Sequence, residues 1–153
     1  MKVLSFTIKK ILAERIFKDF SSGYTINTDV EFTNLVKDKV EMLKADDVFN
    51  LAFKFTVGYG DGAEKDRKID KKEASKGGEV IFEGNILLAA EKEEAKDMIK
   101  GWKKKEIPAN IRFPLFNMIL KKCSSRALAL EEEINLPSHV PMPQLHPGQN
   151  QQS

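Results

Sequence analysis

The sequence is poor in the residues that carry most catalytic and metal chemistry. Its 153 residues include one cysteine, Cys123, and two histidines, His139 and His146. A lone cysteine cannot form an intramolecular disulfide, which agrees with a reducing compartment. Both histidines fall in a proline-rich tail, where we expect the backbone to be too mobile to hold a catalytic or metal geometry. These three residues also lack metal-ligand spacing, so the sequence predicts no metal site.

Charge of one sign and long apolar runs are also missing. Lys and Arg number 25 against 23 Asp and Glu, a formal net charge of +2 that is too small to indicate nucleic-acid binding. No window holds the roughly 18 apolar residues of a membrane-spanning helix. Residues 1–15 contain a short apolar run interrupted by Lys9 and Lys10, without a signal-peptide cleavage site. We therefore expect a cytoplasmic protein that neither inserts into a membrane nor binds nucleic acid.

The size and composition predict one globular domain. Apolar residues make up 41% of the chain and charged residues 31%, which is the balance of a soluble protein with one core. Beyond residue 135 the sequence turns to proline and uncharged polar residues. We expect a single domain over residues 1–135, followed by a proline-rich, partly disordered tail over residues 136–153.

Alternation of apolar and polar residues predicts four strands, near residues 3–18, 25–36, 47–59 and 79–90. The alternation slips around Ile11 in the first strand, which indicates a bulge. Gly84 in the fourth strand indicates a bulge or a close backbone approach. On the second strand one face is expected to carry Ile26, Thr28, Val30, Phe32, Asn34 and Val36. No helical crossover separates these strands, so the sheet should be antiparallel.

The periodicity changes from that of a strand to that of a helix at Glu91. Two helices are predicted, near residues 91–105 and 114–133, and Pro108 and Pro114 predict an irregular connection between them. The fold class is therefore α+β, with a four-stranded antiparallel sheet followed by two C-terminal helices.

The motifs that could indicate an enzyme have simpler structural explanations. Residues 58–62 (GYGDG) lack the spacing of a phosphate-binding loop and favour a hairpin turn. The lysines at 103–105 lie where a helix C-terminus favours cations. Adjacent acids such as Glu131 and Glu132 are expected to be solvated. The sequence thus offers no catalytic or cofactor-binding residues, and we do not expect an enzyme.

The strongest remaining pattern is aromatic. Phe53 and Phe55 lie on the apolar face of the third strand, and Trp102, Phe113 and Phe116 flank the connection between the helices. All five side chains could form the core on which the helices pack. Alternatively, they could wall an open groove for apolar peptide. Periodicity does not distinguish these interpretations.

Four local strings, in this order along the chain, resemble the SecB family of export chaperones. They are residues 6–12 (FTIKKIL), 47–57 (DVFNLAFKFTV), 79–88 (EVIFEGNILL) and 109–115 (ANIRFPL). The resemblance spans roughly residues 4–134 and implies the fold predicted above, assembly into dimers or tetramers, and a groove that holds unfolded polypeptide without nucleotide or metal. Within it, the groove would be walled by Phe53, Phe55, Trp102, Phe113 and Phe116.

Two departures from that family argue against a partnership with the SecA motor. SecB proteins are acidic, whereas this chain is at +2, and the family's usual C-terminal string is replaced by residues 136–143 (LPSHVPMP). The leading hypothesis is an ATP-independent chaperone, or holdase, that binds non-native polypeptides and can self-associate. The alternative is a structural or protein-docking module that has kept the SecB-like fold and binds one folded partner.

Overall fold

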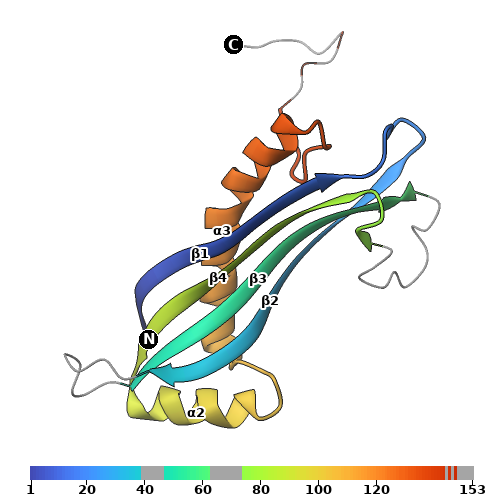
Figure 1. The fold of residues 1–153 in the computed structure, drawn as a ribbon. Helices are drawn as coiled ribbons and strands as arrows, with labels where there is room; N and C mark the ends of the chain where they lie inside the picture. Colours follow the sequence, from blue (N-terminus) through green and yellow to red (C-terminus); the bar gives the residue numbers. More distant parts are fainter. Residues whose placement is uncertain (39–46, 63–73, 144, 146, 148–153) are drawn as a thin grey trace.

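The computed structural model describes residues 1–38, 47–62, 74–143, 145 and 147, which form a four-stranded antiparallel sheet followed by two helices (Figure 1). The elements are β1 (Lys2–Arg15), β2 (Tyr24–Asp38), β3 (Asp47–Asp61), β4 (Gly78–Ala90), α2 (Lys92–Trp102) and α3 (Ala109–Glu133). The α+β fold class predicted from the sequence is confirmed, and each predicted strand agrees with an observed one to within a few residues.

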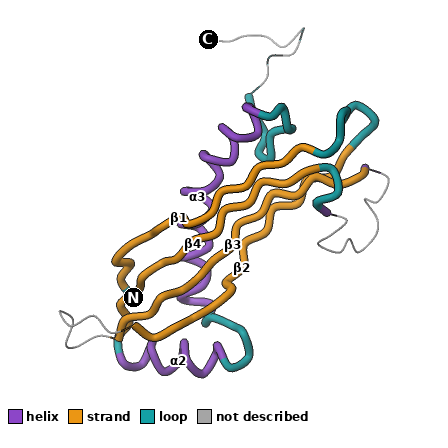
Figure 2. Tube along the Cα trace, viewed as in Figure 1, coloured by secondary structure: helices purple, strands orange, loops and turns teal. Residues whose placement is uncertain are grey.

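The strand order is β1-β4-β3-β2, so β3 and β4 form the centre and β1 and β2 the two edges. Helix α3 crosses one face of the sheet, and α2 lies across the end of the sheet near the N-terminus (Figures 1 and 2). The N-terminal ammonium group of Met1 reaches α2 there and lies 2.7 Å from Glu94 Oε1. Among the described residues, the opposite face of the sheet carries no helix.

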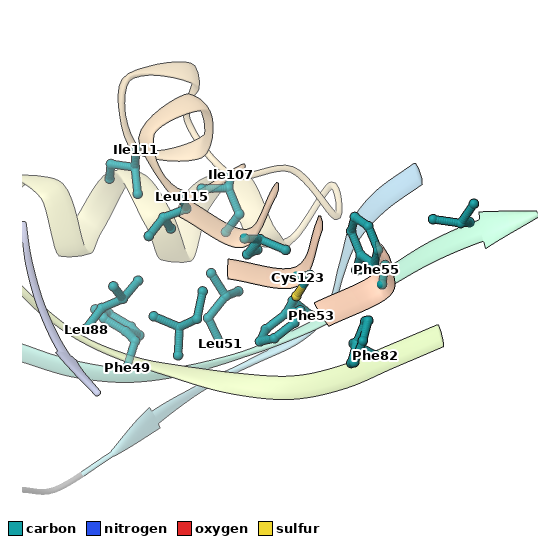
Figure 3. Close-up of a cluster of buried hydrophobic side chains, with 14 of the residues drawn as sticks. Phe49, Leu51, Phe53, Phe55, Phe82, Leu88, Ile107, Ile111, Leu115 and Cys123 are labelled. Carbon is teal, nitrogen blue, oxygen red and sulfur yellow. The ribbon is translucent and has the colours of Figure 1, made fainter. Parts of the chain in front are cut away.

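The core lies between the sheet and α3 (Figure 3). Alternate residues of β3 point toward the helix because successive side chains of a strand lie on opposite faces. The buried residues of α3 recur every four positions, which places them on one side of the helix. From the two central strands and α3, the core includes Phe49, Leu51, Phe53, Phe55, Phe82, Leu88, Ile111, Leu115, Ile119, Cys123 and Ala127.

A bulge changes the face that β2 presents to the helices. Phe32 pairs with Phe53 and Leu35 with Leu51, and the register shifts by one residue between Phe32 and Asn34. One extra residue moves every later side chain to the other face. The expectation that Asn34 and Val36 continue the apolar face is therefore wrong. Leu35 takes that place, and Val36 is 52% exposed on the opposite face.

The predicted irregularity in β1 and the close approach at Gly84 are both confirmed. The register of β1 against β4 shifts at Val3–Ser5 and again at Ile8–Lys10, and Gly84 lies opposite Ile8. A Cβ added to Gly84 would lie 2.1 Å from the main-chain oxygen of Thr7. Only glycine fits there, because a backbone oxygen in a paired strand cannot move aside easily.

Helix α3 begins earlier than the sequence predicted. It starts at Ala109, and the Pro108 carbonyl accepts hydrogen bonds from the main-chain N–H groups of Ile111 and Arg112 at 3.0 and 2.8 Å. Pro114 therefore lies inside the helix rather than at its start. The fixed φ angle of proline suits a helix, but Pro114 is the sixth helical residue, so it removes one hydrogen bond of the helix at a cost of about 3 kcal/mol. The connection between the helices is accordingly shorter than expected.

The first residues of the predicted tail pack against the domain. Leu136 is buried, and the Tyr59 hydroxyl donates a hydrogen bond of 2.6 Å to the Pro137 carbonyl. The side chain of Arg15 donates to the main-chain oxygen of Asn135 at 2.7 Å, which ties β1 to the end of α3. The expectation that His139 lies on mobile backbone is wrong, since its side chain is 2% exposed. His146 lies outside the described residues.

Candidate functional site

Two of the five predicted groove residues lie in the core. Phe53 and Phe55 are fully buried between the sheet and α3 (Figure 3). The ring of Phe6 stacks on that of Phe53 with centroids 5.0 Å apart, and the Phe82 ring lies 5.9 Å from that of Phe55. In this structure neither side chain is available to a ligand at the surface.

The other three predicted residues are accessible and lie near the β2 edge of the sheet. Phe113, in the first turns of α3, is 58% exposed. Phe116, one turn further along, is half-buried, and its ring stacks on that of Phe32 of β2 with centroids 4.9 Å apart. Trp102 is half-buried at the last position of α2. The structure therefore divides the predicted set into a buried pair and an accessible trio.

An open hollow of about 230 Å³ lies where β2 meets α2. Its wall combines apolar side chains with two lysines, and Ile99 in it is 43% exposed. The lining residues are Leu35, Lys37, Phe49, Ile99, Trp102 and Lys103. We use the name aromatic edge for the accessible apolar residues of this region, which are Phe32, Leu35, Ile99, Trp102, Phe113 and Phe116.

Three residues of the aromatic edge are not among the predicted site residues: Phe32, Leu35 and Ile99. Phe32 and Leu35 could not be placed there without the strand order, which brings β2 to the edge of the sheet. Ile99 could have been found, because it lies three residues before Trp102 and so on a neighbouring turn of the same helix.

Cations accompany the most accessible aromatic rings. The Arg112 guanidinium carbon lies 5.1 Å from the centre of the Phe113 ring, and Lys105 Nζ lies 5.9 Å from that of Trp102. At these distances a cation is attracted to the face of the ring. Lys37 in turn pairs with Asp47, with Nζ 3.1 Å from Oδ1. The aromatic edge is therefore an apolar surface with a basic border.

A buried acid–histidine pair lies near the other end of α3. Glu131 and His139 are each 2% exposed, and His139 Nδ1 lies 2.8 Å from both carboxylate oxygens of Glu131. The main-chain N–H of His139 also donates to Glu131 Oε1 at 2.9 Å. Burial, followed by the negative charge of Glu131, raises the pKa of Tyr59 far above its ordinary value. The expectation that Glu131 is solvated is therefore wrong.

The Glu131–His139 pair is placed to hold the chain and not to act on a substrate. Both side chains are closed off from solvent, so no external molecule reaches the imidazole. Cys123 is equally inaccessible in the core, and burial raises the pKa of its thiol to about 11. A thiol with that pKa is a poor nucleophile near neutral pH.

In the part of the chain that the structure describes, no three His, Cys, Asp or Glu side chains gather as a metal ion would require. None of the described helices combines the length and the apolar character needed to cross a membrane.

Comparisons with known proteins found similarity to a solved structure. No protein-family model matches the sequence, and no curated protein matches it either. A solved structure of a SecB-like chaperone from Mycobacterium tuberculosis, in complex with a ChAD peptide from the HigA1 antitoxin, is similar with a TM-score of 0.47. The two sequences are 13% identical, and the match covers 95% of this chain and 91% of that chain.

Proposed function

We propose that this protein is a cytoplasmic, non-enzymatic holdase that binds segments of non-native polypeptide without nucleotide. The observation that carries the proposal is the aromatic edge, an accessible apolar surface beside the hollow between β2 and α2. Unfolded chains expose the apolar side chains that such a surface can cover. The resemblance of four sequence strings to SecB export chaperones supports the same function.

The position of β2 suits an extended client. On one side β2 pairs with β3, and on the other it has no neighbouring strand among the described residues. An extended polypeptide can pair with the main chain of an edge strand, and alternate side chains of that polypeptide then point to one face. On the helix side of the sheet, those side chains would meet the hollow and the rings of Trp102 and Phe116.

We assign different roles to the five groove residues. Trp102, Phe113 and Phe116 would contact the client directly. Phe53 is the cross-strand partner of Phe32, whose ring stacks on Phe116, so Phe53 would support the contact surface from the core. Phe55 lies two residues further along β3, on the same face as Phe53, and would support the contact surface in the same way.

The proposal is tested by light scattering from several unrelated proteins as they aggregate. A holdase should suppress the aggregation of all of them at near-stoichiometric amounts, and Trp102→Ala and Phe113→Ala should weaken the suppression. Met142→Ala is the matched control, since Met142 is 55% exposed on the C-terminal segment, away from the aromatic edge. Suppression of no client would refute the holdase and favour a docking module for one folded partner.

We further propose that the protein self-associates through β1. This strand lies at a sheet edge and carries an exposed apolar residue, Ile11, at 57% exposure. Unpaired edge strands invite pairing with a second copy, and a lysine in place of Ile11 would disfavour that pairing. Sedimentation should therefore show an oligomer that Ile11→Lys dissociates. A monomer at about 100 µM, far above the Kd of a stable dimer, would contradict this assembly.

A further inference from the structure

We infer that the preferred clients of the aromatic edge are non-native segments in which an apolar anchor is flanked by acidic residues. This inference rests on the proposed holdase function and names its substrate class. Its starting point is the composition of the hollow, in which Lys37 and Lys103 line the same wall as Leu35 and Trp102. A client side chain that fills the hollow must bring its sequence neighbours within reach of these ammonium groups.

The basic character extends along the border of the site. Residues 100–106 contain four lysines and one glutamate, and Arg112 covers the ring of Phe113. The acidic residues of α2 are Glu93, Glu94 and Asp97, in its first half. The described cations that line or flank the aromatic edge are Lys37, Lys100, Lys103, Lys104, Lys105 and Arg112. Among the described carboxylates, Asp47 pairs with Lys37, and Asp38, Asp97 and Glu106 lie within three residues of one of these cations in the sequence.

Six cations against four carboxylates leave the described border with a net positive charge. A basic client segment would therefore meet like charges on the border, whereas an acidic one would meet partners. The chain's own C-terminal segment is not the complementary occupant, because residues 134–153 contain no aspartate or glutamate. A separate acidic polypeptide segment fits the charge of the surface best.

The size of the preference follows from the exposure of the lysines. An ion pair at the surface of a protein strengthens binding by a factor of about 2 to 5. A client with an acidic residue on each side of its anchor can form two or three such pairs at once. We therefore expect an acidic-flanked segment to bind about 10-fold more tightly than a basic-flanked one with the same anchor.

The test uses the fluorescence of Trp102, which is the only tryptophan of the chain and lies in the hollow. The probes are tryptophan-free unstructured peptides with one shared apolar core, flanked by glutamate, serine or lysine. The glutamate-flanked peptide should bind the full-length protein most tightly and the lysine-flanked peptide least. Raising the salt from about 0.05 M to about 0.5 M should narrow the difference, because screening weakens exposed ion pairs.

Two variants and one control locate the effect. Lys103→Gln removes one charge and should reduce the preference, and Lys103→Glu should reduce it further. Lys76→Glu is the matched control, because Lys76 is an exposed lysine just before β4, at the end of the sheet away from α2. Circular dichroism melts should confirm that all three variants fold.

The outcomes separate the inference from the proposed function. Equal affinity for the three peptides, or a preference that Lys103→Glu and Lys76→Glu change alike, overturns the acidic-client inference while the holdase proposal stands. If none of the peptides binds, both are overturned.

Discussion

Replacement of His139 by alanine should loosen the C-terminal segment without unfolding the sheet. In the native structure Glu131 accepts hydrogen bonds from both the ring and the main-chain N–H of His139, and both side chains are buried. The variant keeps the main-chain bond and loses the ring. When a buried carboxylate loses its hydrogen-bonding partner and stays buried, the cost is about 3 to 5 kcal/mol.

The structure offers the variant a less costly alternative. The segment from Leu136 to Met142 can leave the domain, and Glu131 then regains water. Besides the His139 ring, the burial of Leu136 holds the segment and is worth about 1.5 to 3 kcal/mol. The hydrogen bonds of the Tyr59 hydroxyl to Pro137, and of the main-chain N–H groups of Leu136 and His139 to Glu131, add about 1 kcal/mol each. Ordering each residue costs about 1 to 2 kcal/mol, so these contacts do not retain all the residues from Leu136 to Met142. We therefore expect a loss of about 1 to 3 kcal/mol, below the cost of an unpaired buried carboxylate.

Urea denaturation and hydrogen exchange measure the two parts of this prediction. The urea midpoint of His139→Ala should fall modestly. The main-chain N–H of Leu136, which donates to the Glu131 carbonyl at 2.8 Å, should lose its protection from exchange while Phe53 of β3 keeps its own. Glu132→Gln, an exposed neighbour on the same helix, is the control and should change neither. Unchanged protection at Leu136, or loss of protection at Phe53 as well, would refute this reasoning.

The remaining predictions concern the core. Gly84→Ala should destabilise the protein by about 3 kcal/mol, because the new Cβ would lie 2.1 Å from the Thr7 oxygen; an unchanged urea midpoint would contradict the β1–β4 register. Burial raises the pKa of Cys123 to about 11, whereas the thiol of the unfolded chain has a pKa of about 8.5. The contribution of the buried thiol to the free energy of unfolding is therefore fully present below about pH 8.5. It is lost as the pH rises through about 11. Alkaline denaturation should therefore reveal a loss of about 3 kcal/mol that is absent in Cys123→Ala. Phe53→Ala should cost about 3 to 5 kcal/mol of stability. Phe113→Ala should leave the melting temperature nearly unchanged and weaken peptide binding by about 1 to 2 kcal/mol. Equal destabilisation by the two substitutions would exclude Phe113 from the client site.

Strand periodicity predicted the sheet well where one face is continuously apolar. β3 alternates from Phe49 to Tyr59 without interruption, because each of those side chains meets the core. On β2 the same method failed beyond Phe32. Leu35 and Val36 are adjacent apolar residues, and the sequence does not show which of them faces the helices until the bulge fixes the register.

Helix α3 begins at Ala109, before the predicted start at Pro114, because proline is common at the first position of a helix but is not confined to it. The i, i+4 spacing of Ile111, Leu115 and Ile119 already continues through Pro114. A proline at the sixth position of a helix costs about 3 kcal/mol, and the burial of Ile111 and Leu115 favours the earlier start despite that cost. Tertiary packing therefore overrode the local signal.

In the candidate site too, the sequence predicts what depends on neighbouring residues and misses what depends on the tertiary arrangement. The sequence placed Trp102 and Phe113 beside the connection between the helices, because that position depends on neighbouring residues along the chain. Whether Phe53 and Phe55 are covered depends on where α3 crosses the sheet, and the aromatic edge depends on β2 being an edge strand. Both are properties of the three-dimensional arrangement that one sequence does not encode in a local pattern.

The position of Glu131 could have been predicted, and with it the path of the C-terminal segment. Ile119, Cys123 and Ala127 recur every four residues along the buried side of α3, and the next position in that series is Glu131. A carboxylate in the core requires a hydrogen-bonding partner. Residues 134–153 hold no lysine or arginine, so His139 is the first side chain after the helix that can donate a charged hydrogen bond. The buried carboxyl group of Glu131 needs a hydrogen-bonding partner. This need explains why a proline-rich segment without Lys, Arg, Asp or Glu returns to the domain at His139.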